Sequence, residues 1–154
     1  MTLNEILVEM QSLTGITDLS LDRDSRACRL VFDGELEIEF EEVGSEDAGM
    51  FFIHAVVGSL PRSAPAAVFA DLLKAGLFGL ETGLSSFGYD DVREELVLFQ
   101  RFDPRHTDME VFTRELESFL DVLKRRKRKL VDGISNPTLV DPVNSLEYLT
   151  AVRG

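Results

Sequence analysis

The sequence predicts an α+β fold in the order α-β-β-β-α-β-β-α, with an antiparallel twisted sheet and flanking helices. Apolar residues recur at helical spacing near both ends of the chain, whereas the segments between them alternate with a period of two. Turn signals separate neighbouring strand segments, which indicates hairpins. At 154 residues, the chain has room for one domain with a substantial core. We expect this domain to span residues 1–132, followed by an extended or partly disordered tail over residues 133–154.

The first predicted element is a short amphipathic helix over residues 3–13. Its apolar residues repeat at helical spacing, and Glu5 and Glu9 lie on the opposite side. Gly15 follows as a stop signal.

A hairpin is predicted next, with strands over residues 27–33 and 36–43 around the turn signal Asp33-Gly34. The second strand alternates strictly between glutamates on one face and apolar residues on the other, which predicts one solvated and one apolar face. These residues are Glu35, Glu37, Glu39 and Glu41 against Leu36, Ile38 and Phe40.

Two registers are open for this hairpin. A two-residue loop pairs Phe32 with Glu35 and places Leu30 and Phe32 among the glutamates. A three-residue loop pairs Phe32 with Leu36 and Leu30 with Ile38, which unites the apolar residues on one face. We favour the three-residue loop.

The middle of the chain predicts a buried strand, a helix and a second hairpin. Residues 50–57 are apolar on both faces, as expected for a strand that is covered on both sides. Ser63 and Pro65 then open a helix. Residues 84–89 and 96–102 form the second hairpin.

The last predicted helix begins at a capping box formed by Thr107 and Glu110. It carries an apolar stripe and should run to about Leu130, with Gly133 as a stop signal.

The net charge of the chain limits the classes of partner that it can bind. Sixteen Lys and Arg against 28 Asp and Glu give a net charge of −12, which repels phosphate backbones and anionic lipids. We therefore expect no nucleic-acid or membrane partner, and attraction for basic or polar polypeptides. The first residues lack the cationic start of a signal peptide, and no apolar run approaches the ~18 residues of a membrane helix.

Few residues could carry catalysis. A nucleophile pair of Cys28 and His54 would need hydrogen-bond reach and an orienting third group, and no local signature supports it. We interpret Cys28 as a small core residue, His54 as a packed strand residue and His106 as a surface loop residue. A small enzyme that uses these three residues stays an alternative.

Metal and phosphate sites are not predicted either. Two histidines and one cysteine in unrelated elements do not form a ligand cluster, and strand alternation spreads the glutamates of 35–42 along one face. The glycine-rich segment 76–83 has neither dinucleotide-binding nor Walker A spacing. We expect no catalytic residue, no metal and no cofactor.

Residues 124–129 form a basic run that holds six of the sixteen cations. The run lies in the last turns of the predicted helix, where cations offset the negative end of the helix dipole. Six consecutive residues point around the whole circumference, so we expect this end to be largely solvated. Docking of a protein partner, or local contact with an anion, stays open.

Three segments carry a family resemblance: residues 72–78, 82–90 and 95–102. Together with the element order, small size and acidic charge, they resemble the class I type III secretion chaperones, the CesT-like or Tir chaperone family. The resemblance covers about residues 3–130. Gly76 is a departure, since the family often has Asn at this helix exit.

The resemblance implies a non-enzymatic chaperone of the bacterial cytoplasm. It would bind the N-terminal segment of a secreted effector and keep that effector soluble and competent for secretion. The implied partners are the effector, a second copy of the chain and components of the secretion apparatus. The alternative is a non-enzymatic regulatory or adaptor protein that docks a partner through its basic helix end.

Two sets of apolar residues are the expected contact sites. We place the client on the first helix and the two hairpins, although the candidate side chains could also belong to the core. The candidate client contacts are Leu3, Ile6, Leu7, Leu30, Phe32, Ile38 and Phe40. The resemblance places the homodimer contact on the second helix and the neighbouring late strands, and the candidate residues are Val68, Phe69, Leu72, Leu73 and Phe78.

Overall fold

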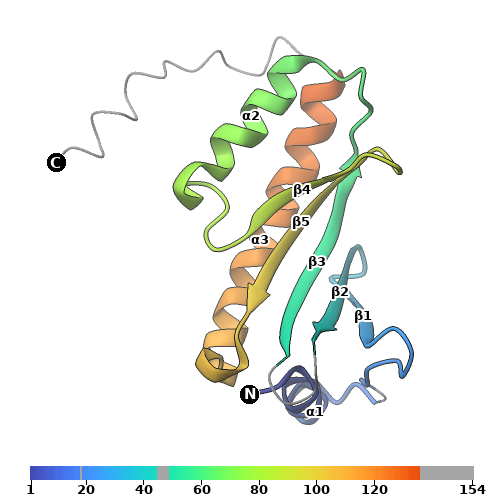
Figure 1. Cartoon of the computed structure of the whole chain (residues 1–154), viewed down its shortest axis with the longest axis vertical. Coiled ribbons are helices and arrows are strands. Elements are labelled where there is room, and N and C mark those ends of the chain that lie inside the picture. Colours follow the sequence, from blue (N-terminus) through green and yellow to red (C-terminus); the bar gives the residue numbers. More distant parts are fainter. Residues whose placement is uncertain (18, 45–48, 136–154) are drawn as a thin grey trace, which may run out of the picture.

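The computed structural model of the protein describes residues 1–17, 19–44 and 49–135. In these residues five strands form one antiparallel sheet in the order β1-β2-β3-β5-β4, and three α-helices pack beside it (Figure 1). The predicted α+β order is confirmed. The elements are α1 (Leu3–Thr14), β1 (Ala27–Phe32), β2 (Leu36–Val43), β3 (Met50–Ser59), α2 (Ala66–Gly76), β4 (Ser86–Asp90), β5 (Glu95–Phe102) and α3 (Met109–Ser135), with short 3-10 turns η1 (Leu77–Gly79) and η2 (Pro104–His106).

The hydrophobic core lies between one face of the sheet and the helices α1 and α3. Long α3 runs beside the sheet, and α1 lies across its lower end in Figure 1. Alternate residues of each strand point into this core, together with the apolar stripes of both helices. Its largest fully buried side chains are Leu3, Ile6, Leu7, Leu36, Ile38, Phe40, Phe51, Ile53, Leu60, Leu98, Phe112 and Phe119.

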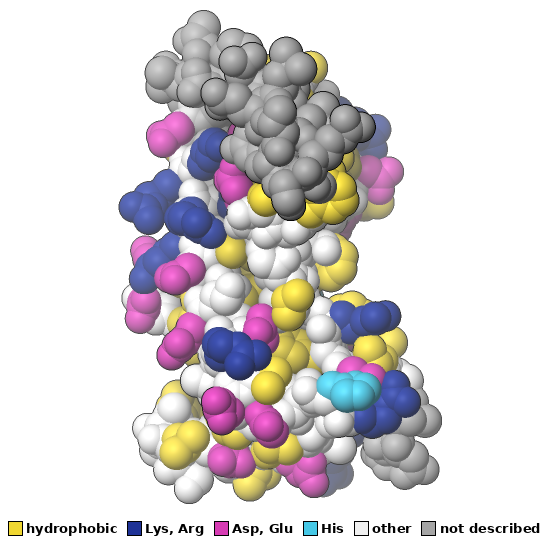
Figure 2. Space-filling model, turned by 90° about the vertical axis from the view of Figure 1, so that its left-hand side faces the viewer, with side chains coloured by type: hydrophobic (Ala, Val, Ile, Leu, Met, Phe, Trp, Pro, Cys, Tyr) yellow, Lys and Arg dark blue, Asp and Glu magenta, His cyan; other side chains and the backbone are white. Residues whose placement is uncertain are grey.

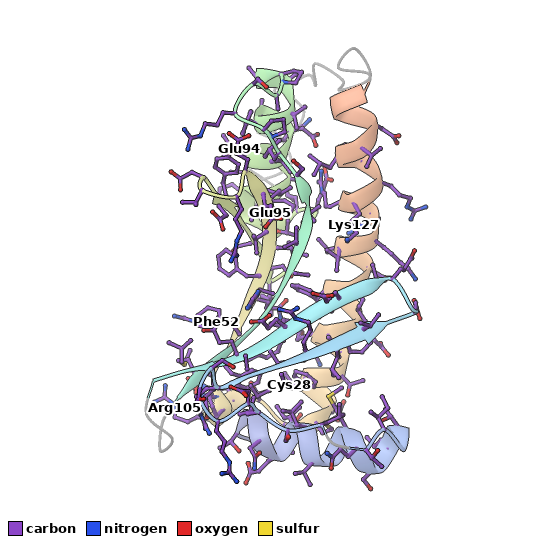
Figure 3. All side chains as sticks on the ribbon, turned by 90° about the vertical axis from the view of Figure 1, so that its right-hand side faces the viewer. Cys28, Phe52, Glu94, Glu95, Arg105 and Lys127 are labelled. Atoms are coloured by element: carbon purple, nitrogen blue, oxygen red, sulfur yellow. The ribbon has the colours of Figure 1, made fainter. Side chains whose placement is uncertain are left out.

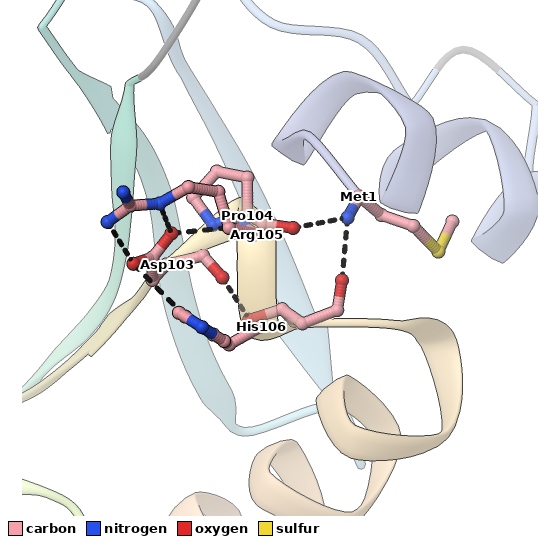
Figure 4. A network of polar contacts seen from close by, with 6 residues as sticks. Met1, Asp103, Pro104, Arg105 and His106 are labelled. Carbon is pink, nitrogen blue, oxygen red and sulfur yellow. Dashed lines mark hydrogen bonds and ion pairs between the residues drawn. The ribbon is translucent and has the colours of Figure 1, made fainter.

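The first helix is fixed at both ends by local hydrogen bonds. Thr2 and Glu5 form a capping box, and Gly15 ends the helix in the left-handed conformation with φ of +72°. The backbone nitrogen of Met1 donates to the carbonyl oxygens of Pro104 at 2.7 Å and Thr107 at 2.6 Å (Figure 4). These bonds attach the start of α1 to the turn that precedes α3.

The first hairpin has the three-residue loop that the apolar pattern favours. Phe32 lies opposite Leu36, and Leu30 lies opposite Ile38. The side chain of Lys124 on α3 donates to Asp33 at 2.6 Å, so the tip of the hairpin is held against the long helix.

The predicted limits of α3 are wrong at both ends. The side chain of Asp108 caps the helix by accepting from the Val111 amide at 2.8 Å, whereas the hydroxyl of Thr107 donates to the Asp103 carbonyl at 2.8 Å. A capping box of Thr107 and Glu110 is therefore not formed. The helix also continues past Gly133 to Ser135. Most of the predicted tail, residues 136–154, lies outside the described residues.

Candidate protein-binding surface

The two faces of the sheet differ in what covers them. On β3, the side chains of Phe51 and Ile53 are buried against the helices, while Phe52 and Val56 alternate with them and point to the other side. Figure 3 shows Phe52 directed away from α3. No element of the described part of the chain packs across this second face, so the prediction of a strand covered on both sides is wrong for the single chain.

This uncovered side, which we call the open face, carries apolar residues in its centre. Val56 is 43% exposed, and its neighbours on β5 and β3 are partly exposed. The open face comprises Glu37, Glu39 and Glu41 of β2, Phe52, His54 and Val56 of β3, and Val97, Phe99 and Arg101 of β5.

A groove of about 550 Å³ lies on the open face. Its floor is apolar, and Gly88 leaves the ring of Phe99 accessible because a Cβ there would lie 3.5 Å from that ring. The lining residues are Glu41, Val43, Phe52, His54, Gly88, Tyr89, Asp90, Val97 and Phe99. An apolar groove of this size on an antiparallel sheet suits the side chains of an extended polypeptide.

Glutamates of β2 border the groove. Arg29 lies 3.3 Å from Glu37 and 2.8 Å from Glu39, so these two carboxylates share one cation. The imidazole Nε2 of His54 lies 3.4 Å from Glu41 and 3.9 Å from Glu39. Nε2 nevertheless has no hydrogen-bond partner in the described residues. The predicted solvated glutamate face of β2 is confirmed.

The same alternation separates the residues that could have formed a nucleophile pair. Cys28 pairs with Phe40 on the covered face, whereas His54 lies on the open face. Burial also raises the pKa of the Cys28 thiol, which disfavours the nucleophilic thiolate. His106 is an exposed loop residue beside Asp103. Within the described ranges, no three His, Cys, Asp or Glu side chains are placed to hold a metal ion.

A second apolar surface lies at the end of α2 and beyond it, and we call it the α2–η1 patch. Leu73 is 79% exposed and Phe78 is 80% exposed. Phe78 also has a φ of +53°, an uncommon conformation for an aromatic residue. The members of the patch are Leu73, Leu77, Phe78, Leu80 and Leu84. In Figure 2, apolar side chains reach the surface among charged ones on the face shown.

The structure places most candidate client contacts inside the core. Five of the seven are almost fully buried: Leu3, Ile6, Leu7, Ile38 and Phe40. Leu30 and Phe32 are partly buried and pack against the same core. A role in client binding stays a prediction for all seven, and for the five buried side chains it requires that the packing around them opens.

The candidate dimer contacts divide in a similar way. Val68 and Leu72 are buried within the chain, and Phe69 packs edge-on against Tyr89. Only Leu73 and Phe78 are fully available to a second copy. The sequence analysis did not select the exposed members Leu80 and Leu84. The pattern that could have identified them is the recurrence of apolar residues between the glycines of the segment that follows α2.

The basic run is less solvated than predicted. Arg126 is 3% exposed, since its guanidinium lies between the carboxylates of Asp71 and Glu81 and over the ring of Phe87. Lys129 also contacts Asp71, at 2.8 Å. The run thus joins α3 to α2 and to the segment after η1, and this use leaves fewer cations for docking a partner.

The sequence profile of the Tir chaperone protein (CesT) family matches residues 5–127. This match covers most of the chain. The chain belongs to the Tir chaperone protein (CesT) family. A search of curated proteins found no match.

Solved structures with the same fold agree with this membership of the CesT family. The ExsC-ExsE complex contains a chain that matches with a TM-score of 0.66 and 20% identity, over 81% of this chain and 90% of that chain. The heterodimeric ExoU-SpcU complex from the type III secretion system of Pseudomonas aeruginosa matches with a TM-score of 0.63 and 20% identity, over 88% and 99%. The Yersinia pestis type III secretion chaperone SycH in complex with a fragment of YscM2 matches with a TM-score of 0.61 and 15% identity, over 80% and 98%.

The described helices of this CesT-family chain include none that is long and apolar enough to cross a bilayer. Its accessible apolar surfaces include the open face and the α2–η1 patch, and their exposure fits a protein that acts by contact with other polypeptides.

Proposed function

We propose that this protein is a cytoplasmic chaperone that binds the N-terminal segment of a type III secretion effector and keeps it soluble and competent for secretion. Membership of the CesT family and the likeness to chaperone-effector complexes support this function. The observation that carries the proposal is the apolar groove of the open face, bordered by glutamates in a chain of net charge −12.

The binding mode follows from the sheet. An extended client segment places apolar side chains in the groove, while its backbone can pair with the free edges of β1 or β4. The binding free energy comes from apolar burial and main-chain hydrogen bonds. The protein therefore acts without catalysis, and we infer that it is not an enzyme.

The working unit is a homodimer formed through the α2–η1 patch. An apolar patch with two large, almost fully exposed side chains is unfavourable in water, and two-fold symmetry lets one patch cover the same patch on a second copy. Leu73 and Phe78 are the contacts that this dimer uses.

Co-expression tests the chaperone function. The candidate client is the product of the neighbouring open reading frame, expressed with and without this chain. The chain should make the client soluble and co-purify with its N-terminal segment. A client that is equally soluble without this chain would contradict the proposal, as would loss of function on replacing Cys28, His54 and His106 together in a variant that stays folded.

A further inference from the structure

The cations of the basic run on α3 differ in whether the fold uses them. Arg126 and Lys129 form ion pairs with Asp71 and so join α3 to α2. Within the described part of the chain, neither Lys127 nor Arg128 lies within ion-pair distance of a carboxylate. These two positive charges therefore contribute no ion pair to the fold.

The position of Lys127 and Arg128 along α3 does not explain them either. The helix runs to Ser135, so both residues lie about two turns before its last residue. The helix dipole acts mainly on charges within the last turn. The expectation that the basic run offsets the helix dipole is therefore wrong for these two residues.

Both side chains line a groove between α3 and the tip of the first hairpin, which we call the α3 groove. Its volume is about 530 Å³, and its lining residues are Glu35, Leu36, Lys124, Lys127 and Arg128. In Figure 3, the first hairpin crosses in front of α3 below the labelled Lys127. Because residues three and four positions apart share one side of a helix, the three cations face the groove together.

The carboxylates at the α3 groove do not balance its cations. Asp33 lies 2.6 Å from the amino group of Lys124 and neutralises it. The hydrogen bond with Asp33, and to a smaller extent the charge of Glu35, raise the pKa of Lys124. Glu35 is the only carboxylate among the described residues that line the groove, so Lys127 and Arg128 exceed it by one positive charge.

An acidic polypeptide segment has the charge and the spacing that this groove requires. In an extended segment, residues two apart point to the same side and lie about 7 Å from each other. The long side chains of Lys127 and Arg128 can each meet one of two carboxylates at that spacing. The screening length at physiological ionic strength is about 8 Å, so a bound segment responds to these nearby charges more than to distant ones.

A nucleic acid fits the α3 groove less well than a short acidic segment. Its backbone continues past the groove on both sides, with a phosphate at every nucleotide. Along the neighbouring surface of α3, Glu117 and Asp121 lie among the cations. Phosphates that continue along this surface would meet both carboxylates.

The client is expected at another place on the molecule. Its proposed groove lies on the open face of the sheet, and the two grooves share no lining residue. A second polypeptide can therefore occupy the α3 groove while the client stays bound.

We propose that the α3 groove binds an acidic segment of a polypeptide partner other than the client, and that Lys127 and Arg128 recognise its carboxylates. This inference goes beyond the proposed chaperone function, because it assigns a second binding surface with its own partner chemistry.

Nuclear magnetic resonance titration of the ¹⁵N-labelled full chain tests the groove, since it detects weak binding and locates it. The probes are short peptides of serine and glycine with three alternate positions occupied by glutamate, glutamine or lysine. The glutamate peptide should bind about fivefold more tightly than the glutamine peptide, the size expected for two exposed ion pairs. Its addition should shift the backbone amide signals of Glu35, Leu36, Lys127 and Arg128.

Two double variants and a matched control make the test specific. Lys127→Gln with Arg128→Gln should abolish the preference for the glutamate peptide, and Lys127→Glu with Arg128→Glu should reverse it in favour of the lysine peptide. The control, Arg23→Gln with Arg93→Gln, removes two exposed cations that do not line the groove and should keep the wild-type preference. The amide spectra show whether each variant is folded.

Three outcomes of the titrations would overturn the inference. Equal affinity of wild-type protein for the glutamate and glutamine peptides would remove the charge recognition. An equal loss of preference in the Arg23 and Arg93 control would indicate bulk charge. Tighter binding of a single-stranded RNA oligonucleotide than of the glutamate peptide, lost when Lys127 and Arg128 become glutamine, would assign the groove to nucleic acid.

Co-expression and light scattering separate the partner from the client and from a second copy. The variant with glutamine at both positions should solubilise the client as wild type does and keep the wild-type mass. Loss of the client would assign the α3 groove to the client, and a fall in mass would assign it to a second copy, so either result would overturn the inference. If wild-type protein fails to solubilise the client but prefers the glutamate peptide, the chaperone function fails and the acidic site stands.

Discussion

β3 presents similar apolar residues to two very different environments. On the covered face, Phe51 and Ile53 are fully buried in the core, whereas Phe52 and Val56 on the open face keep contact with solvent. A strand that is apolar on both faces therefore contains two interfaces, one within the chain and one for a partner. Experiments that separate stability from binding should distinguish the two faces.

The largest contrast in stability is expected between two adjacent phenylalanines. Phe51→Ala should lower the free energy of unfolding by about 3–5 kcal/mol, because it removes a buried ring and leaves a cavity. Phe52→Ala should lower it by less than about 1 kcal/mol, since that ring is partly exposed already. Urea denaturation of the two variants checks this. An equal loss for both variants would show that the open face is covered in the folded protein.

The covered side is also held by a buried charge. Arg126→Ala should lower the free energy of unfolding by about 2–3 kcal/mol, because it removes the buried guanidinium that pairs with Asp71 and Glu81 and leaves Asp71 with Lys129 alone. Lys127→Ala, in the same basic run, should have almost no effect. Thermal unfolding monitored by circular dichroism compares them. Equal melting temperatures would mean that the run is solvated, as the sequence alone predicted.

Phe32 lies at the boundary between stability and binding. It is partly buried, and its ring centroid lies 6.5 Å from that of Phe40. Phe32→Asp should lower the free energy of unfolding by about 1–3 kcal/mol and still leave a folded protein that has lost its client. Thermal melting and a client pull-down measure both effects. Full client binding by the folded variant would remove Phe32 from the client site.

The dimer prediction concerns the α2–η1 patch. Phe78→Asn should convert the dimer to a monomer of 17.2 kDa without a loss of stability in the monomer, because asparagine tolerates the left-handed backbone at this position. Light scattering at micromolar concentration measures the mass. Val92→Asn changes another exposed apolar residue, in the turn between β4 and β5, and should stay dimeric. A wild-type particle of monomer mass would contradict the dimer.

The smallest effect is expected at an exposed turn outside both faces. Arg105 donates to the carboxylate of Asp103 and holds its pKa below the ordinary value of 3.8. A carboxyl with a lowered pKa in the folded state stabilises that state above its ordinary pKa, and the contribution is lost as the pH falls. The melting temperature of Asp103→Asn should therefore be slightly lower than that of wild type near neutral pH. The difference should shrink below pH 3.8, and a difference that grows in acid would contradict this assignment.

Alternation and turn signals predicted the order of strands and helices along the chain and the register of the first hairpin. These features depend on local patterns, since Leu30 and Phe32 can share a face with Ile38 in one register only. The role of Arg126 could not be predicted, because Asp71 and Glu81 reach it from other elements. The open face could be predicted from the sequence only in part. Apolar residues on both faces of 50–57 indicated two interfaces, but periodicity does not show whether the second cover belongs to the same chain.

The order of elements has a consequence for the synthesis of this chaperone. The strands β3 and β5 pair across an intervening helix and a further strand, so this contact joins residues as distant in sequence as Phe51 and Phe102. Contacts between distant residues form slowly because a long loop must close first. On the ribosome, the meander of β1, β2 and β3 emerges early, with its core face bare until α3 follows. A protein that protects other chains from aggregation thus passes through a stage in which its own nascent chain is exposed to the same hazard.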